Sequence, residues 1–255
     1  WAALDVVAST GSTNADLLER SVREDVADGT VLVAEHQGAG RGRLGRSWST
    51  PPRAGLAVSV LVRPAAARER WSWLPLLTGV AVVDALAGLG VDAGLKWPND
   101  VLVRGPGRAG KVCGVLAEAA GDAVVLGAGV NVTQTDGELP APPPLEPAAG
   151  AVPVAPTSLA LAGARSTDRD TVLRRYLRAL RERLDEWAAD PAATAAAYRA
   201  ACLTLGEPVR AHLPGGDVLD GEAEDVDADG RLVVRASGGA RTGLAAADVV
   251  HLRGR

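Results

Sequence analysis

A segment rich in glycine and arginine limits the fold of this chain more than any other stretch. It reads QGAGRGRLGRSW over residues 37–48, and two consecutive prolines follow at 51–52. Gly40, Gly42 and Gly45 have the G-x-G-x-x-G spacing of a dinucleotide-binding turn, which lies between a strand and a helix. The prolines stop a helix from forming directly after this segment. The segment is therefore predicted to be a loop between two strands.

The residues further along the chain also argue against a dinucleotide site. Such a site places Asp or Glu about 20 residues after the glycines, where it binds a ribose hydroxyl. Arg63 and Pro64 stand at that distance here. The three arginines of the segment can instead bind the oxygens of carboxylates or phosphates in a forked geometry. Taken alone, the segment is equally compatible with a solvated basic loop that contains turn glycines.

A second glycine-rich stretch resembles a phosphate-binding loop only in part. Residues 105–111 read GPGRAGK, which matches the G-x-x-x-x-G-K of a P-loop. A P-loop continues with Ser or Thr and then a helix, whereas Val112 follows here and begins an apolar, strand-like run. Lys111 is therefore predicted to stand at the start of a strand, where its charge is well placed for an anion.

The pentapeptide KWPND, between these two loops, carries three side chains suited to phosphate or metal chemistry. Lys96 offers a positive charge, Asn99 an amide, and Asp100 a carboxylate for Mg²⁺ or for a proton. A plain turn containing Pro98 would account for Asn99 and Asp100 without any function.

Hydrophobic periodicity predicts an α/β chain followed by a short all-β region. Thr13 and Asp16 resemble a capping box that opens a short helix. Thr167 and Asp170 are predicted to open a longer helix whose apolar stripe ends at Trp187. The remaining predicted elements are strands at 30–35, 54–63, 113–118 and 123–132, a helix at 71–89, a proline-rich surface loop at 139–156, and short strands from residue 206 onward.

Length and composition agree with one large and one small domain. The chain has 255 residues, 47% of them hydrophobic, and its net charge of -4 argues against general nucleic-acid binding. We place the domains at 1–204 and 205–255. No apolar run reaches the roughly 20 residues that span a bilayer. Cys113 and Cys202 fit core positions better than a disulfide or a metal site, and these features indicate a cytoplasmic protein.

Four cationic side chains and one carboxylate are predicted to meet at the ends of neighbouring strands. They are Arg41, Arg43, Lys96, Lys111 and Asp100. Two unit charges of the same sign about 4 Å apart repel by roughly 4 kcal/mol at an effective dielectric constant of 20. Because a fixed frame of cations offsets this repulsion, the arrangement suits a reaction between two anions.

Taken together, the motifs resemble those of bacterial biotin protein ligases. The matching stretches are STN at 12–14, EHQGAGRGRLGRSW at 35–48, KWPNDV at 96–101, GRAGKVCGVLAE at 107–118, GAGVNV at 127–132 and TSL at 157–159. They cover nearly the whole chain, and the combination of GRGRxGRxW with KWPND is highly specific. The resemblance implies an α/β (α+β) fold, with a catalytic domain built on a mixed β-sheet with helices and a small C-terminal SH3-like β-barrel.

The resemblance also implies a two-step reaction. The carboxylate of biotin attacks the α-phosphate of MgATP to give biotinyl-5′-AMP and pyrophosphate. A lysine of a biotin carboxyl carrier domain, as in acetyl-CoA carboxylase, then displaces AMP. ATP and Mg²⁺ are co-substrates, biotin is the substrate, and no tightly bound metal is expected. No DNA or membrane partner is implied, since only eleven residues precede Ser12 and leave no room for the DNA-binding domain of many members. The expected state is a monomer or weak homodimer.

The family motifs assign roles to individual residues. The residues expected to bind biotin are Ser12, Thr13, Asn14, Gln37, Arg41, Gly42, Arg43 and Lys111. The residues expected to bind the nucleotide are Arg41, Arg43, Trp48, Lys96, Asn99 and Asn131. The residues expected to be catalytic are Arg43, Lys96, Asp100 and Lys111. His36, next to Gln37, is expected to be structural.

Two other functions fit parts of this pattern. Lipoate–protein ligation uses a related fold and an acyl-adenylate, although KWPND with GRGRLGR favours biotin. A non-catalytic biotin-binding regulatory module would not need the cations and Asp100. The glycines of residues 38–45 add a dynamic expectation, because ordering each residue costs roughly 1–2 kcal/mol of backbone entropy. This stretch is predicted to be mobile without ligand and ordered over the adenylate.

Overall fold

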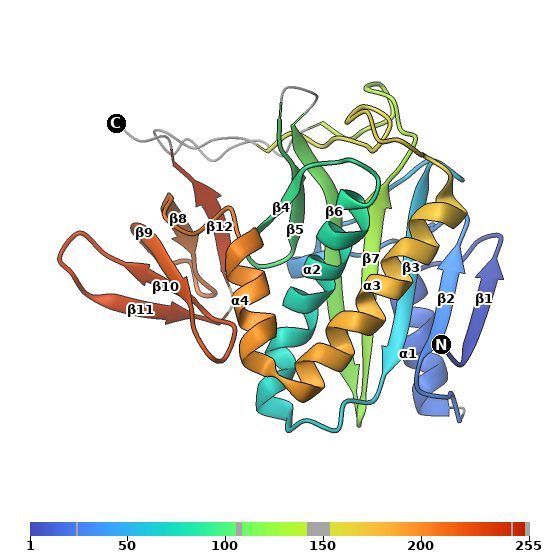
Figure 1. The fold of residues 1–255 in the computed structure, drawn as a ribbon, viewed down its shortest axis with the longest axis horizontal. Coiled ribbons are helices and arrows are strands. Elements are labelled where there is room, and N and C mark those ends of the chain that lie inside the picture. Colours follow the sequence, from blue (N-terminus) through green and yellow to red (C-terminus); the bar gives the residue numbers. More distant parts are fainter. Residues whose placement is uncertain (24, 106–108, 142–153, 246, 253–255) are drawn as a thin grey trace.

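A seven-stranded mixed sheet forms the centre of the molecule (Figure 1). The computed structural model describes residues 1–23, 25–105, 109–141, 154–245 and 247–252. In spatial order the strands are β1 (Ala3–Val7), β2 (Thr30–Ala34), β3 (Gly55–Val62), β7 (Ala123–Asn131), β6 (Gly110–Ala120), β5 (Asp100–Val103) and β4 (Ala93–Lys96). β1 and β2 are parallel and the other neighbours are antiparallel, which confirms the predicted mixed sheet.

Helices lie on both faces of this sheet. The helices are α1 (Thr13–Arg23), α2 (Trp73–Ala87), α3 (Arg169–Ala189) and α4 (Pro191–Ala201). α1 lies on one side of the sheet and the other three lie on the opposite side (Figure 1). Side chains alternate along β3, because Val60 and Val62 belong to the core under α2 and α3, whereas Leu61 belongs to the cluster that contains Leu17 of α1. This strand is therefore apolar on both faces.

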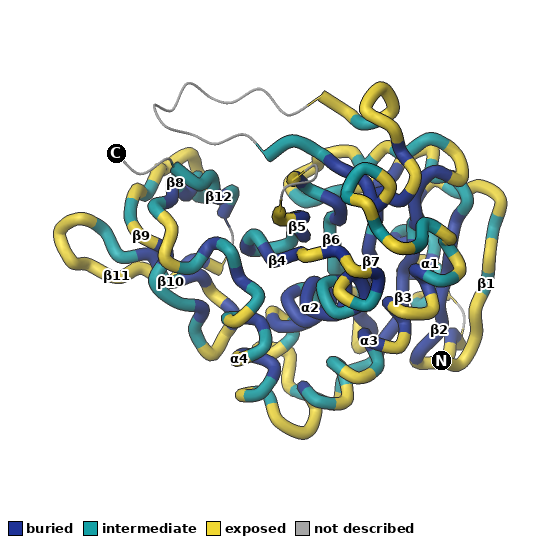
Figure 2. The backbone as a smooth tube through the Cα atoms, turned by 45° about the horizontal axis from the view of Figure 1, so that its top comes forward, coloured by how far each residue is buried: buried dark blue, intermediate teal, exposed yellow. Residues whose placement is uncertain are grey.

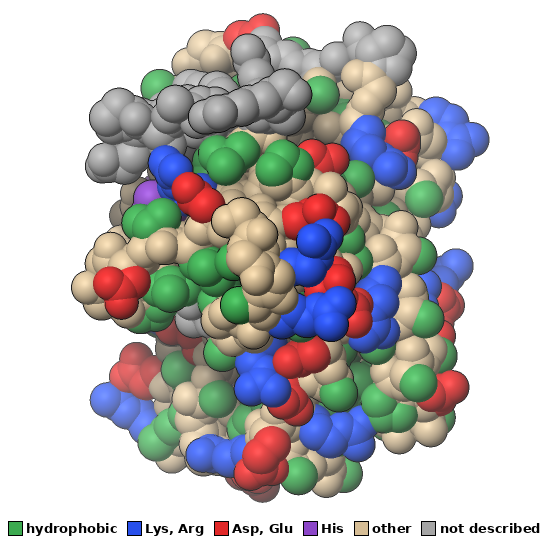
Figure 3. Space-filling view, turned by 90° about the vertical axis from the view of Figure 1, so that its left-hand side faces the viewer, with side chains coloured by type: hydrophobic (Ala, Val, Ile, Leu, Met, Phe, Trp, Pro, Cys, Tyr) green, Lys and Arg blue, Asp and Glu red, His purple; other side chains and the backbone are tan. Residues whose placement is uncertain are grey.

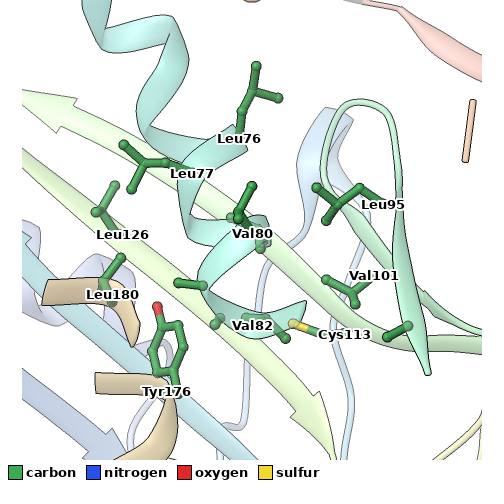
Figure 4. Packing of buried hydrophobic residues seen from close by; sticks show 14 of the residues in the cluster. Leu76, Leu77, Val80, Val82, Leu95, Val101, Cys113, Leu126, Tyr176 and Leu180 are labelled. Atoms are coloured by element: carbon green, nitrogen blue, oxygen red, sulfur yellow. The ribbon is translucent and has the colours of Figure 1, made fainter. Parts of the chain in front are cut away.

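α2 lies in the middle of the core. Leu76 and Val82 are as buried as Leu77 and Val80, so the helix is apolar around most of its circumference. Figure 4 shows these side chains in the packing that also includes α3, and Figure 2 shows α2 as a largely buried segment. The helix predicted at 71–89 is thus confirmed, and its outer side is also apolar because α3 and α4 cover it. A short 3₁₀ turn, Arg68–Ser72, precedes the helix.

The predicted capping box of α1 is wrong in its residues. The helix begins at Thr13 itself. The Ser12 hydroxyl accepts a hydrogen bond from the N–H of Ala15 at 3.4 Å, and Asp16 accepts one from the Thr10 hydroxyl instead of capping the helix. Thr13 is thereby left for contacts inside the fold, described below.

The start of α3 is displaced by one residue from the prediction. Asp168 is the N-cap, and its carboxylate accepts hydrogen bonds from the N–H of Thr171 at 2.9 Å and from its hydroxyl at 2.6 Å. Thr167 lies before the cap, and Asp170 forms an ion pair with Arg174 at 2.7 Å. Asp168 suits the N-cap position because its carboxylate caps the helix and its negative charge interacts favourably with the positive end of the helix dipole.

Some elements had no clear signal in the sequence. β1, β4 and β5 have four or five residues each, too few for a periodicity to stand out. α4 is rich in alanine and lacks an apolar stripe, but Asp190 caps it and Pro191 occupies its first turn. Of the predicted loop at 139–156, residues 142–153 lie outside the described residues.

The C-terminal region forms a separate five-stranded antiparallel sheet. Its strand order is β11 (Arg241–Leu244), β10 (Leu232–Arg235), β9 (Val218–Val226), β8 (Pro208–His212) and β12 (Asp248–His251). The small all-β region predicted from residue 206 onward is thus confirmed, and the ladders place β11 and β12 at opposite edges. Figure 3 shows charges of both signs interspersed on this side of the molecule, as in the pair of Arg210 with Asp220 at 2.6 Å.

The two sheets share one hydrophobic core. A turn of the C-terminal sheet contacts α2 and the β4–β5 turn through two indoles. Trp73 Nε1 donates to the carbonyl of Ala228 at 2.7 Å, and Trp97 Nε1 donates to that of Gly230 at 3.2 Å. The division at residues 204 and 205 stays a prediction. This packing brings β12 close to the turn between β4 and β5.

Candidate active site

A cavity of about 720 Å³ lies beside the N-terminus of α1. It exists because the side chains that β3 and β7 direct to this face change along the strands. Leu61 and Val125 pack in the cluster under α1, whereas Ala57, Gly127 and Gly129 line the cavity. The volume lies within the roughly 300–1,000 Å³ range of small-molecule sites.

All the residues that the sequence assigned to binding or catalysis line this cavity. They come from the start of α1, the glycine–arginine segment, the β4–β5 turn, the start of β6 and the end of β7. The set is Ser12, Thr13, Asn14, Gln37, Arg41, Gly42, Arg43, Trp48, Lys96, Asn99, Asp100, Lys111 and Asn131. Their individual roles stay predictions.

Four polar side chains, which we call the floor network, occupy one end of the cavity: Thr13, Asn14, Gln37 and Ser59. Gln37 Oε1 accepts hydrogen bonds from the N–H of Thr13 at 2.8 Å and from its hydroxyl at 3.0 Å. The hydroxyl of Ser59, which is 0% exposed, lies 2.7 Å from Thr13 Oγ1 and 2.6 Å from Asn14 Oδ1. These buried bonds orient the floor in the protein alone.

The amide of Asn14 is fully used inside this network. Its Nδ2 donates to the carbonyl of Leu116 and to Glu118 Oε2, both at 3.0 Å, while its Oδ1 contacts Ser59. A Cβ atom at Gly127 would collide with this amide. In this structure Asn14 therefore fastens α1 to β6, and the predicted contact with biotin stays a prediction.

The glycine–arginine loop, residues 38–47, is held by backbone hydrogen bonds. The N–H of Gly38 donates to the carbonyl of Thr10 at 2.9 Å, and the N–H of Trp48 donates to that of Gly40 at 2.8 Å. A Cβ atom at Gly40 would collide with the Trp48 carbonyl, so this close approach needs glycine. These bonds offset part of the ordering entropy. The mobility of the empty loop stays a prediction.

Trp48 forms a wall of the cavity. Its indole lies against β6 and β7 so closely that a Cβ atom at Gly129 would be 2.6 Å from it and one at Gly114 would be 3.1 Å from it. Lys111 Nζ lies 5.5 Å from the centre of the ring, a cation–π distance. A flat aromatic face beside a lysine suits a nucleotide.

Lysines at the other end of the cavity face two carboxylates. Lys111 Nζ forms an ion pair with Asp100 Oδ1 at 2.7 Å. Burial lowers the pKa of Lys96, and the negative charges of Asp100 and Asp248 oppose that shift. The protein thus keeps a second, partly desolvated lysine a short way from the first.

Arg43 adds to this cationic end. Burial lowers the pKa of its guanidinium, and repulsion from Arg46 acts in the same direction. Within the described ranges, neither Arg43 nor Lys96 makes a side-chain hydrogen bond or an ion pair. Their charges are consequently available to a bound anion.

The two asparagines assigned to the nucleotide also hold the protein together. Asn99 Nδ2 donates to the carbonyl of Val115 at 2.9 Å. Asn131 Nδ2 donates to the carbonyl of Thr157 at 2.9 Å, and its Oδ1 accepts from Gln134 Nε2 at 2.9 Å. Both therefore fix segments that border the cavity, and their contact with a nucleotide stays a prediction.

Three polar residues near the cavity were not identified from the sequence. Ser59 lies in an apolar strand, where a single serine gives no indication of a functional role. Glu118 lies within β6 and forms an ion pair with Arg41 at 3.1 Å. Asp248, on β12, lies 3.5 Å from Arg46. The alternating glycines of GAGVN could have indicated the cavity, because residues two apart in a strand share a face, and two glycines there leave that face without side chains.

The remaining predicted features lie outside this cavity. His36 does not line it, and its Nδ1 lies 3.4 Å from the Ser9 hydroxyl. Cys113 is buried in the core (Figure 4), where burial raises the pKa of its thiol to about 12. Among the described residues, no group of three or more His, Cys, Asp or Glu could hold a metal ion. The same part of the chain contains no helix long and apolar enough to cross a membrane.

Two family descriptions match the chain. Residues 6–132 match the Biotin/lipoate A/B protein ligase family, and residues 204–252 match the Biotin protein ligase C terminal domain. The first match contains most of the cavity, and the second contains the C-terminal sheet.

Full-length relatives and a solved structure agree with these matches. The biotin--[acetyl-CoA-carboxylase] ligase of Mycobacterium tuberculosis is 47% identical over 258 residues, which cover 99% of this chain and 90% of that protein. The enzyme of the same description from Paracoccus denitrificans is 32% identical, covering 96% and 98%. The biotin protein ligase from Aquifex aeolicus in complex with biotin and ATP has a TM-score of 0.78 at 28% identity, covering all of both chains.

Proposed function

This chain belongs to the biotin protein ligase family, whose members join biotin to protein at the expense of ATP, and we propose that the cavity carries out both steps. In the first step, a carboxylate oxygen of biotin attacks the α-phosphorus of ATP, the bond to pyrophosphate breaks, and biotinyl-5′-AMP forms. In the second step, the amine of an acceptor lysine attacks the acyl carbon. AMP leaves with the bonding electrons, and the nitrogen loses a proton.

One observation carries this proposal: a polar floor held by hydrogen bonds and two cations without an ion pair among the described residues meet in a single cavity. Biotin has a neutral ureido ring at one end and a carboxylate at the other. The ureido carbonyl can accept from the Ser12 hydroxyl and from Gln37 Nε2, since Gln37 already uses its oxygen for Thr13. The valerate chain would then run past Trp48 toward the cations.

The cations lower the barrier of the first step. Two anions must approach one another, and Arg43, Lys96 and Lys111 can stabilise the charge that builds up on the α-phosphate. Asp100 holds Lys111 in position through the ion pair at 2.7 Å. Exclusion of water by the glycine–arginine loop would protect the mixed anhydride between the steps.

Mg²⁺ fits this site as a partner of the nucleotide. Magnesium is usually held by one or two carboxylates, water and substrate phosphates. Asp100 lies on the cavity wall near the proposed phosphate position and can supply such a ligand. The ion would neutralise phosphate charge there, and we expect it to arrive with ATP. Elemental analysis of the nucleotide-free protein tests this, and a stoichiometric metal would contradict it.

The acceptor is proposed to be a biotin carboxyl carrier domain, as the names of the full-length relatives suggest. We place the reaction in the cytoplasm and expect a monomer or weak homodimer. A small exposed apolar surface fits this expectation: Leu4 and Val6 lie together on β1, an edge strand of the main sheet, whereas Val22 and Val218 come from α1 and β9. Sedimentation over a range of concentrations tests the oligomeric state.

The decisive experiment supplies every reactant at once. The purified protein is incubated with biotin, MgATP and a purified carrier domain, and the carrier is weighed by mass spectrometry. The expected result is the mass gain of one biotinyl group, with pyrophosphate and AMP as products. Calorimetry with biotin and with lipoate distinguishes biotin ligation from lipoate ligation. Release of pyrophosphate excludes a non-catalytic biotin-binding module. Tighter binding of lipoate, or no pyrophosphate, would overturn the proposal.

A further inference from the structure

Glu118 connects the floor network to the glycine–arginine loop. Its Oε2 accepts a hydrogen bond from Asn14 Nδ2 at 3.0 Å. Its Oε1 and Oε2 lie 3.1 and 3.2 Å from Arg41 Nη2. The residue belongs to β6, where it pairs with Val125 of β7, so its backbone is held by the sheet. One carboxylate thus joins a fixed strand to the middle of a glycine-rich loop.

The burial of this pair differs between its two partners. The side chain of Glu118 is 24% exposed and that of Arg41 is 46% exposed. An exposed ion pair is weak because two long side chains must be ordered at once. Here Asn14, which is 4% exposed, already orients the carboxylate, so only the arginine has to be ordered. The contact is therefore stronger than an ordinary surface pair.

Arg41 and Arg43 are two residues apart, but the structure places them differently. Arg41 is engaged by Glu118 in the protein alone. Arg43 makes no such pair with a described residue, and its surroundings are other charges of the cationic end. The two arginines of the GRGR motif therefore cannot have the same task.

We infer that Glu118 is a positioning residue that holds the glycine–arginine loop over the cavity through Arg41, and so retains the acyl-adenylate between the two steps. This inference rests on the proposed function. Arg43 then neutralises phosphate, and Arg41 keeps the loop closed. Glu118 touches neither the bond that forms nor the bond that breaks, so its loss leaves adenylate synthesis nearly unchanged.

Hydrogen exchange of the protein without substrates tests the contact itself. E118Q keeps the shape of the side chain and an acceptor for Asn14 but removes the charge that binds Arg41. The amides of Gly42 and Arg46, which are hydrogen-bonded inside the loop, should exchange roughly tenfold faster, while those of β7 stay unchanged. The matched control is D122N, because Asp122 lies in the β6–β7 turn, is 81% exposed and pairs with Arg63 away from the loop.

Escape of the intermediate tests the consequence for the reaction. With biotin and MgATP but no acceptor, E118Q should release free biotinyl-5′-AMP roughly tenfold faster than wild type, with the pyrophosphate burst within about twofold. R41Q should also release free biotinyl-5′-AMP faster than wild type, and adding E118Q to R41Q should accelerate the release no further, since both changes remove one contact. D122N should behave like wild type. Because Arg41 lies on the loop, R41Q carries the test even if E118Q folds poorly.

Three outcomes would overturn the inference. They are loop exchange in E118Q equal to that of wild type, a reduced burst without faster release, or effects of E118Q and R41Q that simply add. A wild-type protein that makes no adenylate would refute the proposed function instead. The exchange experiment needs no substrate and would still decide whether Glu118 holds the loop.

Discussion

The two ends of the cavity are built in opposite ways. In the floor network, the amide of Asn14 and the oxygen of Gln37 already have protein partners. At the cationic end, Arg43 and Lys96 have neither a hydrogen bond nor an ion pair among the described residues. Protein hydrogen bonds hold the floor in place before any ligand arrives, whereas at the cationic end only Lys111, of the cations Arg43, Lys96 and Lys111, has a direct ion-pair partner in the described residues. A neutral group can thus be recognised by fixed geometry, and anions by unbalanced charge.

The difference has an energetic consequence. Buried hydrogen bonds that are satisfied make a region rigid and cost little. Partly desolvated cations are less favourable in the empty protein, because burial is the main cause that lowers the pKa values of Arg43 and Lys96. We therefore expect the floor to govern affinity for biotin and the cationic end to govern the rate of adenylation.

The largest expected effect comes from removing a cation. Lys111→Ala should reduce pyrophosphate release with biotin and MgATP by roughly 10²–10³, because it removes a charge-assisted contact in the transition state and leaves Asp100 unpaired. Biotin affinity should change far less. Lys111→Arg, which keeps the charge, should retain part of the activity. A folded Lys111→Ala variant that releases pyrophosphate at the wild-type rate would show that the two ends do not divide the work in this way.

Substitutions at two glycines of β7 should distinguish the roles of the two ends of the cavity. Gly127→Ala should weaken biotin binding by roughly 30-fold, because the new Cβ displaces the amide of Asn14. Gly129→Ala should instead raise KM for ATP, because it displaces Trp48. Gly137→Ala is the control, since nothing lies within 4 Å of that position. Calorimetry measures biotin affinity, and initial rates at varied ATP give KM for ATP. If the two variants changed both quantities equally, the two ends of the cavity would not have separate roles.

The cationic end could be predicted from the sequence, and so could Thr13, Asn14 and Gln37 of the floor through the family motifs, but Ser59 and the hydrogen bonds that connect the floor could not. Lys96 directly precedes the turn residues of KWPND and Lys111 directly follows a glycine-rich stretch, and arginines among glycines stand out in any sequence. Glu118 and Ser59 occupy ordinary positions in strands, and only the pairing of β6 with β7 and of β3 with β7 brings them to Asn14. Hydrogen bonds between residues about 45 and 104 positions apart depend on the register of the sheet, which local patterns do not encode.

The secondary-structure elements also divide into those that local sequence patterns predict and those that depend on tertiary packing. Long segments with strong periodicity, such as α3 and β7, were predicted with their correct type. The short strands β4 and β5 become regular only because they pair with each other, and β5 in turn with β6. β12 lies in the region predicted as short strands from residue 206 onward, but its approach to the cavity through Asp248 depends on how the two sheets pack. Local sequence patterns do not encode how these elements pack against one another.

Alkaline pH should weaken the cationic end before it affects the floor. Because burial lowers the pKa of Lys96, its ammonium loses the proton at a pH below the ordinary value of about 10.4. The charge is present at lower pH and lost as pH rises, so KM for ATP should increase by roughly tenfold in that range while biotin affinity stays level. Lys96→Arg should abolish the rise, since arginine stays charged. A rise that persists in this variant would assign the titration to another group.

The smallest expected effect lies behind the cationic end, in the C-terminal sheet. Burial, with a smaller contribution from Lys96, lowers the pKa of His251 to about 4, and its Nε2 lies 3.1 Å from the Thr204 hydroxyl. In the unfolded chain the same imidazole titrates near pH 6.5, so between these values the unfolded state binds more protons. Stability should accordingly fall as pH drops from about 6.5 toward 4, by about 1 kcal/mol after allowance for the partial exposure of the ring. Urea midpoints at pH 7 and pH 4.5 measure this. His251→Gln should show a shallower decline than wild type, and Lys96→Gln a slightly shallower one, because it removes the like charge. Identical slopes in wild type and His251→Gln would mean that His251 is not responsible for the decline, and identical slopes in wild type and Lys96→Gln would mean that the charge of the cationic end does not extend into the C-terminal sheet.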